Sequence, residues 1–474
     1  MNNSVIKSLF WKFTERMSSQ LVTFVVSIVL ARLLTPDDYG TIALITVFIS
    51  LSDVLITSGF SSALIQKKNA DDLDFSSVFF FNIIFSAVIY AILYFSSPSI
   101  AEFYKIPVLC AALRVLALVI PIMAVNSVQQ AYVSRNMMFK KFCYSTLSGS
   151  IFSGIVGIAM AYAGMGIWAL VAQYIVNNAA NMLVLFFVLD WHPSLVFSLE
   201  RMRGLFSYGW KLLCSGLLST GYTQLTSLLI GKLYTSSDLG FYNRGQQYPQ
   251  LVVSNINSTI SAVLFPVLAQ KQEDFLEVKR YTRRAVQVSS YVMWPMMAGL
   301  AVCAEPLVRL MLTEKWLPCV PYLWIACFTF GIWPIHTANL EALKAIGRSD
   351  LFFKLEIIKK AVGLTVLLLT IPHGVMVMAL SAVFTSIISA FVNAYPNTKI
   401  LGYTYQEQLS DMLPSMFWSA LMIIILLPIQ KWIPNDFVCI AVSVLIGAVY
   451  YVAVSILTKS SAFAFLWQMM KKKK

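Results

Sequence analysis

The feature that most restricts this chain is a series of long apolar stretches that recurs along its whole length. Fourteen can be recognised, at 14–34, 41–63, 76–97, 108–132, 143–163, 167–189, 208–233, 246–268, 285–313, 320–346, 352–371, 375–396, 413–430 and 436–457. An α-helix needs about 20 mostly apolar residues to cross the hydrocarbon core of a membrane. The pattern predicts an all-α polytopic membrane protein with about fourteen transmembrane helices. Glu305 and Pro306 interrupt the stretch at 285–313, so we expect a break near its outer end.

The composition supports this prediction. Hydrophobic residues make up 58% of the chain and charged residues 12%, whereas soluble proteins contain roughly 45–50% and about 25%. These proportions exclude an ordinary soluble enzyme, a disordered chain and a secreted disulfide scaffold. Tyrosines and tryptophans near the predicted helix ends, Trp316 among them, fit the aromatic belts at membrane interfaces.

The net charge of +13 is concentrated on one face of this map. With the N-terminus inside, 27 of the 35 lysines and arginines fall on the cytoplasmic face and 8 on the other. Positive residues gather at the cytoplasmic flanks of membrane helices, so the split predicts fourteen spans with both termini in the cytoplasm. It also explains the charge without nucleic acid as a partner. The final Lys471–Lys474 run is interpreted as an anchor at lipid headgroups, with a lysine-type retrieval signal as the alternative.

The sequence contains no motif that indicates catalysis or a resident metal. The seven cysteines form no CxxC pair, and the three histidines are scattered. The patterns HExxH, GxSxG and GxxxxGK[ST] are missing. The loops between the predicted spans are too short for a soluble catalytic domain. We therefore expect a transporter rather than an enzyme, with no cofactor and no metal.

An internal repeat divides the chain. The segment TPDDYG at 35–40 recurs as TSSDLG at 235–240, and further matches at offsets of 199 to 210 extend over six predicted helices. This pattern indicates one duplicated unit. It predicts an N-lobe over 1–205, a C-lobe over 206–400, and a C-terminal helix pair with a basic tail over 401–474. Six helices are an even number, so the two copies are parallel, an arrangement that commonly places a substrate cavity between lobes that rock during transport.

Four sequence blocks carry a resemblance to a known family. They are LARLLTPDDYG at 30–40, DLGFYNRGQQYP at 238–249, PMMAGLAVCAEPLVRLMLTEKWLP at 295–318 and ALKAIGRSD at 342–350. With the two six-helix lobes and the terminal pair, the chain resembles the polysaccharide (Wzx-type) flippases and exporters of the MATE/MOP superfamily. The branch it resembles best is that of the lipopolysaccharide and exopolysaccharide exporters.

The resemblance implies an inner-membrane flippase for undecaprenyl-diphosphate-linked oligosaccharides. Such carriers work by alternating access, often with a proton or sodium gradient. The implied partners are the lipid-linked oligosaccharide, membrane lipids and polysaccharide assembly machinery. Three alternatives stay open at this stage: a cation-coupled multidrug exporter of the same fold, a peptidoglycan-precursor flippase, and a membrane glycan polymerase or ligase.

Basic residues inside predicted helices are candidates for binding the diphosphate of such a substrate. Arginine suits this role because its planar fork can hold two phosphate oxygens. Arg244 is the first candidate, since the repeat places the apolar Leu44 at the equivalent position; a structural arginine paired with Asp238 is the alternative.

The other candidate cations are Lys359, Lys360 and Arg114. Glu356 lies three and four residues before the two lysines and could neutralise them. Arg114 could instead be a snorkelling residue, with its stem in lipid and its head at the interface.

Two acids are candidates for ion coupling, because a carboxylate within the membrane can be neutralised during a transport cycle. Asp53 is the only acid well inside the second predicted helix, and its repeat counterpart is Asn257. The alternative for Asp53 is hydrogen bonding with Ser50 or Ser52. The second candidate, Glu341, is close to Lys344 on the same helical face and is expected to pair with it.

Overall fold

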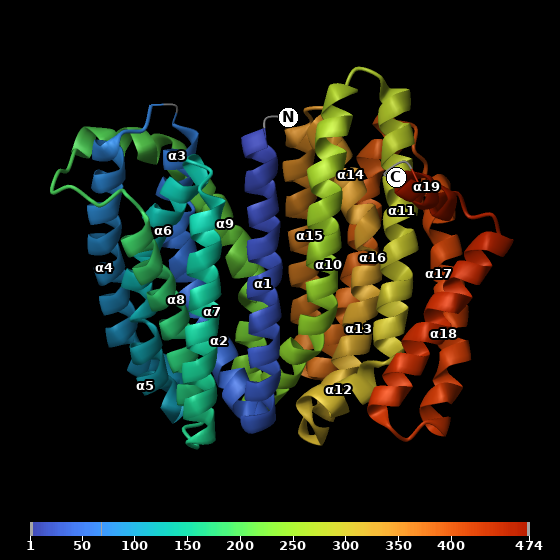
Figure 1. The fold of residues 1–474 in the computed structure, drawn as a ribbon, viewed down its shortest axis with the longest axis horizontal. Helices are drawn as coiled ribbons and strands as arrows, with labels where there is room; N and C mark the ends of the chain where they lie inside the picture. The colour runs from blue at the N-terminus through green and yellow to red at the C-terminus, as the bar shows by residue number, and fades with distance from the viewer. Residues whose placement is uncertain (1–2, 68, 472–474) are drawn as a thin grey trace. The chain divides into compact units, whose positions relative to one another are not determined.

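The computed structural model describes residues 3–67 and 69–471; Lys68 and Lys472–Lys474 of the predicted cytoplasmic charge lie outside the described residues. The described residues form α-helices and two short 3₁₀-helices, without a strand (Figure 1). The first ten helices are α1 (Asn3–Leu33), α2 (Pro36–Thr57), α3 (Phe60–Gln66), α4 (Asp72–Tyr104), α5 (Pro107–Leu116), α6 (Val119–Arg135), α7 (Phe139–Tyr162), α8 (Ile167–Val188), α9 (Leu199–Leu233) and α10 (Ser236–Gln270). The others are α11 (Phe275–Val302), α12 (Ala304–Leu312), η1 (Glu314–Cys319), α13 (Val320–Gly331), α14 (Trp333–Ala345), α15 (Ser349–Thr370), η2 (Ile371–His373), α16 (Val375–Ile400), α17 (Tyr405–Trp432), α18 (Asp436–Leu457) and α19 (Ser461–Lys471).

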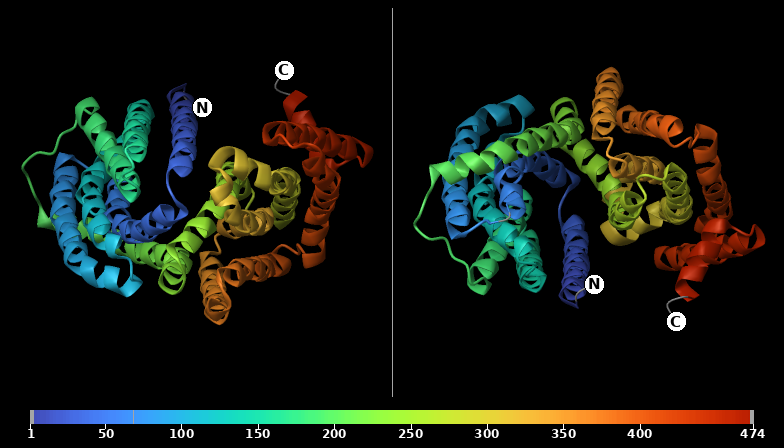
Figure 2. Two further views of the ribbon diagram at one scale, coloured as in Figure 1. Left: turned by 90° about the horizontal axis from the view of Figure 1, so that it is seen from below. Right: turned by 90° about the horizontal axis from the view of Figure 1, so that it is seen from above.

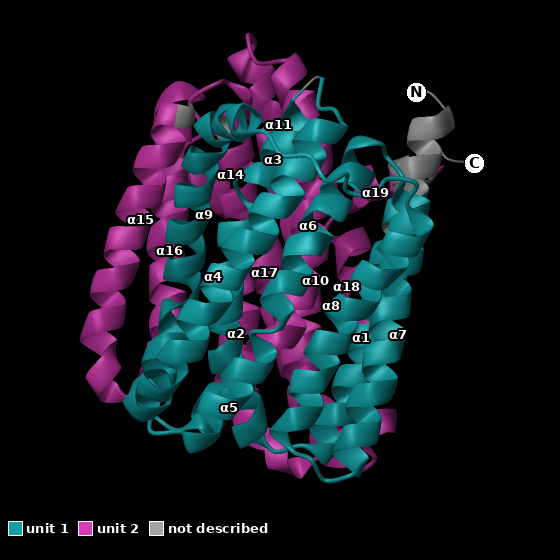
Figure 3. Ribbon diagram, turned by 90° about the vertical axis from the view of Figure 1, so that its left-hand side faces the viewer, with its two compact units in different colours: residues 1–240 teal, residues 241–474 magenta. Residues whose placement is uncertain are grey.

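The chain divides into two compact units, Met1–Gly240 and Phe241–Lys474, with the boundary inside α10 (Figure 3). Within each unit the long helices are seen nearly end-on in the same views, so they run roughly parallel to one another (Figure 2). Each unit is described on its own below. The predicted lobe boundaries at 205 and 400 stay predictions.

Twelve helical segments of the described chain are long and apolar enough to cross a membrane, by length and composition. The predicted spans at 208–233 and 352–371 are also helical, in α9 and α15, but are not among these twelve. Charged residues within α15, such as Lys354, Glu356 and Lys359, lower its hydropathy. The all-α membrane fold is therefore confirmed, whereas the count of fourteen spans stays a prediction.

Several predicted spans consist of two consecutive helices. The break expected within 285–313 is present, because α11 ends at Val302 and α12 begins at Ala304. The spans predicted at 41–63, 108–132 and 320–346 are also divided, into α2 and α3, α5 and α6, and α13 and α14. Apolarity alone did not reveal these divisions.

In unit 1, α7 packs against both α1 and α8 through small and polar residues. A Cβ atom at Gly149 would lie 2.9 Å from the carbonyl oxygen of Asn177, so the helix backbones approach too closely for a larger residue. Ser145 donates hydrogen bonds to Asn181 of α8. Small residues that allow close approach, with polar groups bonded across the contact, are typical of helix packing in membranes.

The repeated TxxDxG segment has the same local structure in both copies. Thr35 and Asp38 form a capping box at the start of α2, with the Thr35 Oγ1 to Asp38 Oδ2 distance at 2.6 Å. Thr235 and Asp238 make the equivalent bonds at the start of α10. A side chain at Gly40 would clash with the carbonyl oxygen of Ser236. The repeat therefore encodes a helix start and a close backbone crossing.

Candidate functional site

Asp53 lies within α2 of unit 1 and is half-buried. The two serines proposed as its partners donate elsewhere: Ser50 to the carbonyl oxygen of Thr46 at 2.7 Å, and Ser52 to that of Phe48 at 2.8 Å. In the described part of the chain, the Asp53 carboxylate makes no hydrogen bond or ion pair. Tyr174 of α8 lies within electrostatic range of it. The role of Asp53 in ion coupling stays a prediction.

Glu341 has a different environment in α14 of unit 2. Its carboxylate is buried and forms an ion pair with Lys344 Nζ at 3.1 Å. The pairing expected from the sequence is therefore present. A carboxylate that already has a cation as its neighbour is less suited to exchange another one.

Arg244 lies on α10 in the part that belongs to unit 2 and is only 4% exposed. Its Nη1 donates to Gln247 Oε1 at 2.6 Å, and its guanidinium carbon lies 5.1 Å from the ring centroid of Trp316. Asp238, the pairing partner considered from the sequence, caps the start of α10. Trp316 is fully buried, so it is one of the boundary aromatics that an interface belt does not explain.

The surroundings of Arg244 bring together two of the sequence blocks that carry the resemblance. Phe241 of α10 contacts Trp316 of η1 edge-on, with ring centroids 6.0 Å apart. A Cβ atom at Gly245 would lie 2.7 Å from the carbonyl oxygen of Cys319, which marks a close approach of α10 to the start of α13. The blocks at 238–249 and 295–318 thus pack against each other in unit 2. Arg244 is held within that packing, and its binding of substrate stays a prediction.

Lys359 lies on α15, where it forms an ion pair with Glu356, as the spacing suggested. Its neighbour Lys360 is half-buried on the same helix. Their contribution to a substrate cavity also stays a prediction.

Arg114 of α5 has a specific contact with α4 in unit 1. Its Nε donates to Ser97 Oγ at 2.8 Å and to the carbonyl oxygen of Tyr94 at 3.2 Å. Pro98 lacks the amide hydrogen that would otherwise bond to this carbonyl, four residues earlier in the helix. Arg114 therefore supplies a donor that the proline removes, and also lies 4.4 Å from the Tyr94 ring centroid.

The predicted residues are distributed over both units. Asp53 and Arg114 belong to unit 1, on α2 and α5, while Arg244, Glu341, Lys359 and Lys360 belong to α10, α14 and α15 of unit 2. Asp53 is the candidate whose surroundings favour function most directly.

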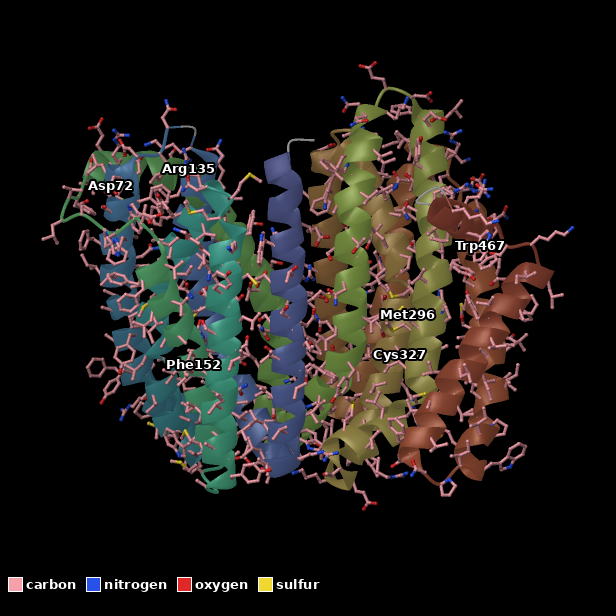
Figure 4. The ribbon with its side chains drawn as sticks, in the orientation of Figure 1. Asp72, Arg135, Phe152, Met296, Cys327 and Trp467 are labelled. Carbon is pink, nitrogen blue, oxygen red and sulfur yellow. The ribbon has the colours of Figure 1, made fainter. Side chains whose placement is uncertain are left out.

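Sequence reasoning missed a charged cluster in unit 1, which we call the α4 joint: Lys67, Asp71, Asp72, Asp74 and Arg201. The fully buried Asp74 accepts from Lys67 Nζ through both oxygens, each at 2.7 Å. Arg201, at the start of α9, lies 3.3 Å from Asp71 and 3.6 Å from Asp74. Asp72 accepts from Trp191 and Ser194 of the segment between α8 and α9. Asp72 and Arg135 mark this end of the unit in Figure 4.

Two acids of this region have lowered pKa values, and both lie outside the predicted spans. The backbone amide of Asp74 donates to Asp71, and with nearby Arg201 this holds the pKa of Asp71 below its usual range. A hydrogen bond from Lys141 lowers the pKa of Asp190 in the same way. Both carboxylates are therefore charged at neutral pH.

Unit 2 contains a second cluster, which we call the α11 joint: Lys279, Arg283, Tyr403, Glu407 and Asp411. Arg283 of α11 donates to both oxygens of Asp411 of α17, at 2.8 and 3.1 Å. The Tyr403 hydroxyl donates to the same carboxylate at 2.8 Å. Lys279 lies 2.9 Å from Glu407.

A neutral network continues from this joint into α14 and α16. Asn339 donates to Gln408 at 2.8 Å and accepts from Asn397 at 2.7 Å. His336 of α14 is bonded to Asn393 of α16, at 3.0 Å. The capping patterns before α4 and α17 were readable signals for Asp71, Asp74 and Glu407. Lys67 is near the first two of these acids in the sequence, but the other cations of the two joints are more than 100 residues away from their partners.

The chain matches a family model described as polysaccharide biosynthesis protein over residues 29–321. It is similar to the succinoglycan biosynthesis transport protein ExoT of Rhizobium meliloti, at 23% identity over 99% of this chain and 96% of that one. It is also similar to the lipopolysaccharide biosynthesis protein WzxC of Escherichia coli, at 23% identity over 80% and 78% of the two chains.

Solved structures share the fold. The lipid II flippase MurJ, in an inward closed conformation, matches with a TM-score of 0.78 at 15% identity, covering 95% of this chain and 99% of that one. An inward-facing multidrug resistance transporter of the MATE family in the MOP superfamily matches with a TM-score of 0.62 at 12% identity, over 83% and 99%. The predicted fold class and the predicted resemblance are confirmed.

Proposed function

The chain belongs to the family of polysaccharide biosynthesis proteins, and from this premise we propose that it is a flippase for lipid-linked oligosaccharides. The substrate would be an undecaprenyl-diphosphate-linked repeat unit, moved across the inner membrane by alternating access for O-antigen, capsule or exopolysaccharide assembly. Family membership is the observation that carries this proposal. The twelve helical segments long and apolar enough to cross a membrane, and the fold shared with a lipid II flippase, support it.

The coupling group of this proposal is Asp53. A carboxylate within a membrane helix is costly, and such residues usually line ion pathways or pair with a partner. Among the described residues Asp53 has no such partner, whereas Glu341 has Lys344. Asn257, the counterpart of Asp53 in the repeat, cannot ionise. We therefore assign proton or sodium coupling to unit 1.

Translocation in proteoliposomes tests both statements. A labelled polyprenyl-diphosphate oligosaccharide is incorporated, and its exposure is followed with a membrane-impermeant glycan-modifying enzyme. We expect protein-dependent exchange between leaflets, accelerated by an imposed proton or sodium gradient. Asp53→Asn should abolish the acceleration, because the amide cannot take up and release a cation.

Glu341→Gln is the matched control, because it also neutralises one intramembrane acid. It should retain the gradient response. Loss of the response in Glu341→Gln, with a normal response in Asp53→Asn, would transfer the coupling role to unit 2. Efflux of cationic dyes without exchange of any lipid-linked glycan would replace the flippase by the multidrug exporter.

Arg244 is the candidate anion-binding residue of this proposal. Arg244→Ala should reduce exchange and also lower stability by about 2 kcal/mol, since a desolvated cation–π contact is lost. Arg244→Lys separates the two effects, because it keeps the charge but not the planar stacking on Trp316. If well-folded Arg244→Ala transports normally, the residue belongs to the packing of unit 2 alone.

A further inference from the structure

Unit 2 contains a polar pocket that the proposed transport does not use. It has a volume of about 340 Å³ and lies among α11, α17, α18 and the start of α19. Its lining includes Tyr291, Ser415, Trp418, Ser455, Thr458 and Lys459. Ser455 and Thr458 donate to the carbonyl oxygens of Tyr451 and Val454, and Tyr291 is bonded to Ser455. The donors left for phosphate oxygens are the lysine ammonium and the hydroxyls of Ser460 and Ser461, which also line the pocket. The half-buried Trp418 suits the boundary between headgroups and acyl chains.

One acid lines the same pocket, and its charge is already compensated. Asp411 accepts from Arg283 Nε at 2.8 Å, from Gln287 Nε2 at 2.7 Å and from the Tyr403 hydroxyl at 2.8 Å. The carboxylate is thus saturated by donors on its other sides. Lys459 is exposed, and no hydrogen bond or ion pair of its side chain occurs in the part of the chain that the structure describes. The pocket therefore presents a net positive charge to a ligand.

The helix that borders the pocket is amphipathic. In α19, Phe463 packs on Tyr291 with ring centroids 6.5 Å apart, and Phe465 lies under Arg284 at 4.4 Å. Trp467, labelled in Figure 4, is 48% exposed, and Lys471 lies 5.6 Å from its ring centroid. An apolar face with aromatic residues next to lysines and arginines is typical of helices that lie in the membrane interface.

We propose that the pocket and α19 together bind the headgroup of an anionic phospholipid. Its phosphate would accept from Lys459 and the hydroxyls of Ser460 and Ser461, while its glycerol and acyl chains would lie along Trp418 and the exposed face of α19. The first residues of α19 also line the pocket, and the N-terminus of a helix attracts negative charge. Basic pockets between membrane helices at the cytoplasmic side are a recognised form of lipid site.

A lipid fits better than free phosphate because the site combines donors with exposed aromatic surface next to α17 and α18, two of the twelve candidate spans. A bound lipid would hold α19 against α11 and α17. The inference does not depend on the transported substrate, so the translocation experiment can fail while this one succeeds.

The test uses the full-length protein in detergent. Native mass spectrometry and thermal unfolding are recorded with phosphatidylglycerol, with phosphatidylcholine and with inorganic phosphate at equal phosphate concentration. We expect phosphatidylglycerol alone to bind and to raise the melting temperature, and this effect should weaken as salt is added. Lys459→Gln should weaken its binding roughly five-fold, the effect of one lysine near an anionic surface.

Lys431→Gln is the matched control, since it removes an exposed lysine near the opposite end of α17 and should leave binding unchanged. Ser461→Ala removes one of the pocket hydroxyls and is the second variant, which should also weaken binding if Lys459→Gln does not fold. Unchanged binding in the pocket variants, or equal binding of phosphatidylcholine, would overturn the proposal. Equal stabilisation by inorganic phosphate would show a site for free phosphate instead of a lipid site.

Discussion

Unit 1 and unit 2 contain comparable helix joints with their charges exchanged. In the α4 joint the acids Asp71 and Asp74 lie at the start of α4, and the cation Arg201 comes from α9. In the α11 joint the cation Arg283 lies on α11, and the acids come from α17. The exchanged charges occupy the same position in their helices. Arg201 lies three residues after Ser198, which caps α9, and Glu407 lies three residues after Thr404, which caps α17.

The two joints share one property: the acid is buried and the arginine is partly exposed. The side chain of the central acid is buried in both, at 0% exposure for Asp74 and 3% for Asp411, while Arg201 and Arg283 remain 39% and 38% exposed. Long basic side chains can keep their heads in water while their stems are buried, which a short carboxylate cannot do. The comparison teaches that the joint requires a satisfied buried acid, whereas the helix that supplies it can change.

The largest expected effect comes from neutralising the buried acids. Asp74→Asn and Asp411→Asn should each lower the free energy of unfolding by about 2–3 kcal/mol, because breaking a buried pair leaves its partners uncompensated. The partial exposure of the cations keeps the loss below that of a fully buried pair. Unfolding titrations in mixed micelles measure the change.

The exposed Asp190, which pairs with Lys141, is the control for this prediction. Asp190→Asn should leave the free energy of unfolding essentially unchanged, because an exposed ion pair contributes little. A small loss in only one of the two buried-acid variants would show that the joints are not equivalent.

Reversing the exchanged position should have an intermediate effect. Arg201→Glu would place a third acid beside Asp71 and Asp74, and Glu407→Arg would repel Lys279 and Arg283. Each should cost about 1–2 kcal/mol in the same titration.

A double variant sharpens this test. Glu407→Arg with Lys279→Glu restores an ion pair of opposite polarity at the 2.9 Å contact, and should recover part of the loss. If the double variant loses as much stability as the two single variants together, the two residues are not coupled. The surroundings in unit 2 would then require the acid on α17 and the cation on α11.

The smallest expected effect is a difference in acid sensitivity. The pKa of Asp71 is lowered in the folded chain, first by the hydrogen bond from the Asp74 amide. Asp71 therefore stabilises the folded chain fully above its unfolded pKa of about 3.9. This stabilisation is lost as the pH falls from that value through the lower pKa of the folded state. Since Asp71 is half-exposed, we expect less than about 0.5 kcal/mol.

Asp71→Ser keeps a side-chain acceptor for the Asp74 amide but removes the titrating group. Melting temperatures between pH 6 and pH 3 should fall less steeply in this variant than in the parent chain. Parallel curves would assign the acid sensitivity of unit 1 to other carboxylates.

The sequence by itself determined the features that depend on residues close together along the chain. Apolar stretches of helical length predicted the membrane fold, and the Thr35 and Thr235 segments predicted an internal repeat. Spacings of three residues were sufficient for the pairs Glu341–Lys344 and Glu356–Lys359. These interactions are set by helix geometry, which is the same in any surroundings.

What only the tertiary structure decided are contacts between residues far apart in the chain. Charge and hydropathy could not show that Arg114 supplies the donor lost at Pro98, that Arg244 packs on Trp316, or that Asp53 remains without a described partner. The two joints belong to the same class, because Arg201 and Arg283 reach acids more than 100 residues away. A charge within a membrane helix is read from one residue, but whether it is compensated depends on which helices pack around it.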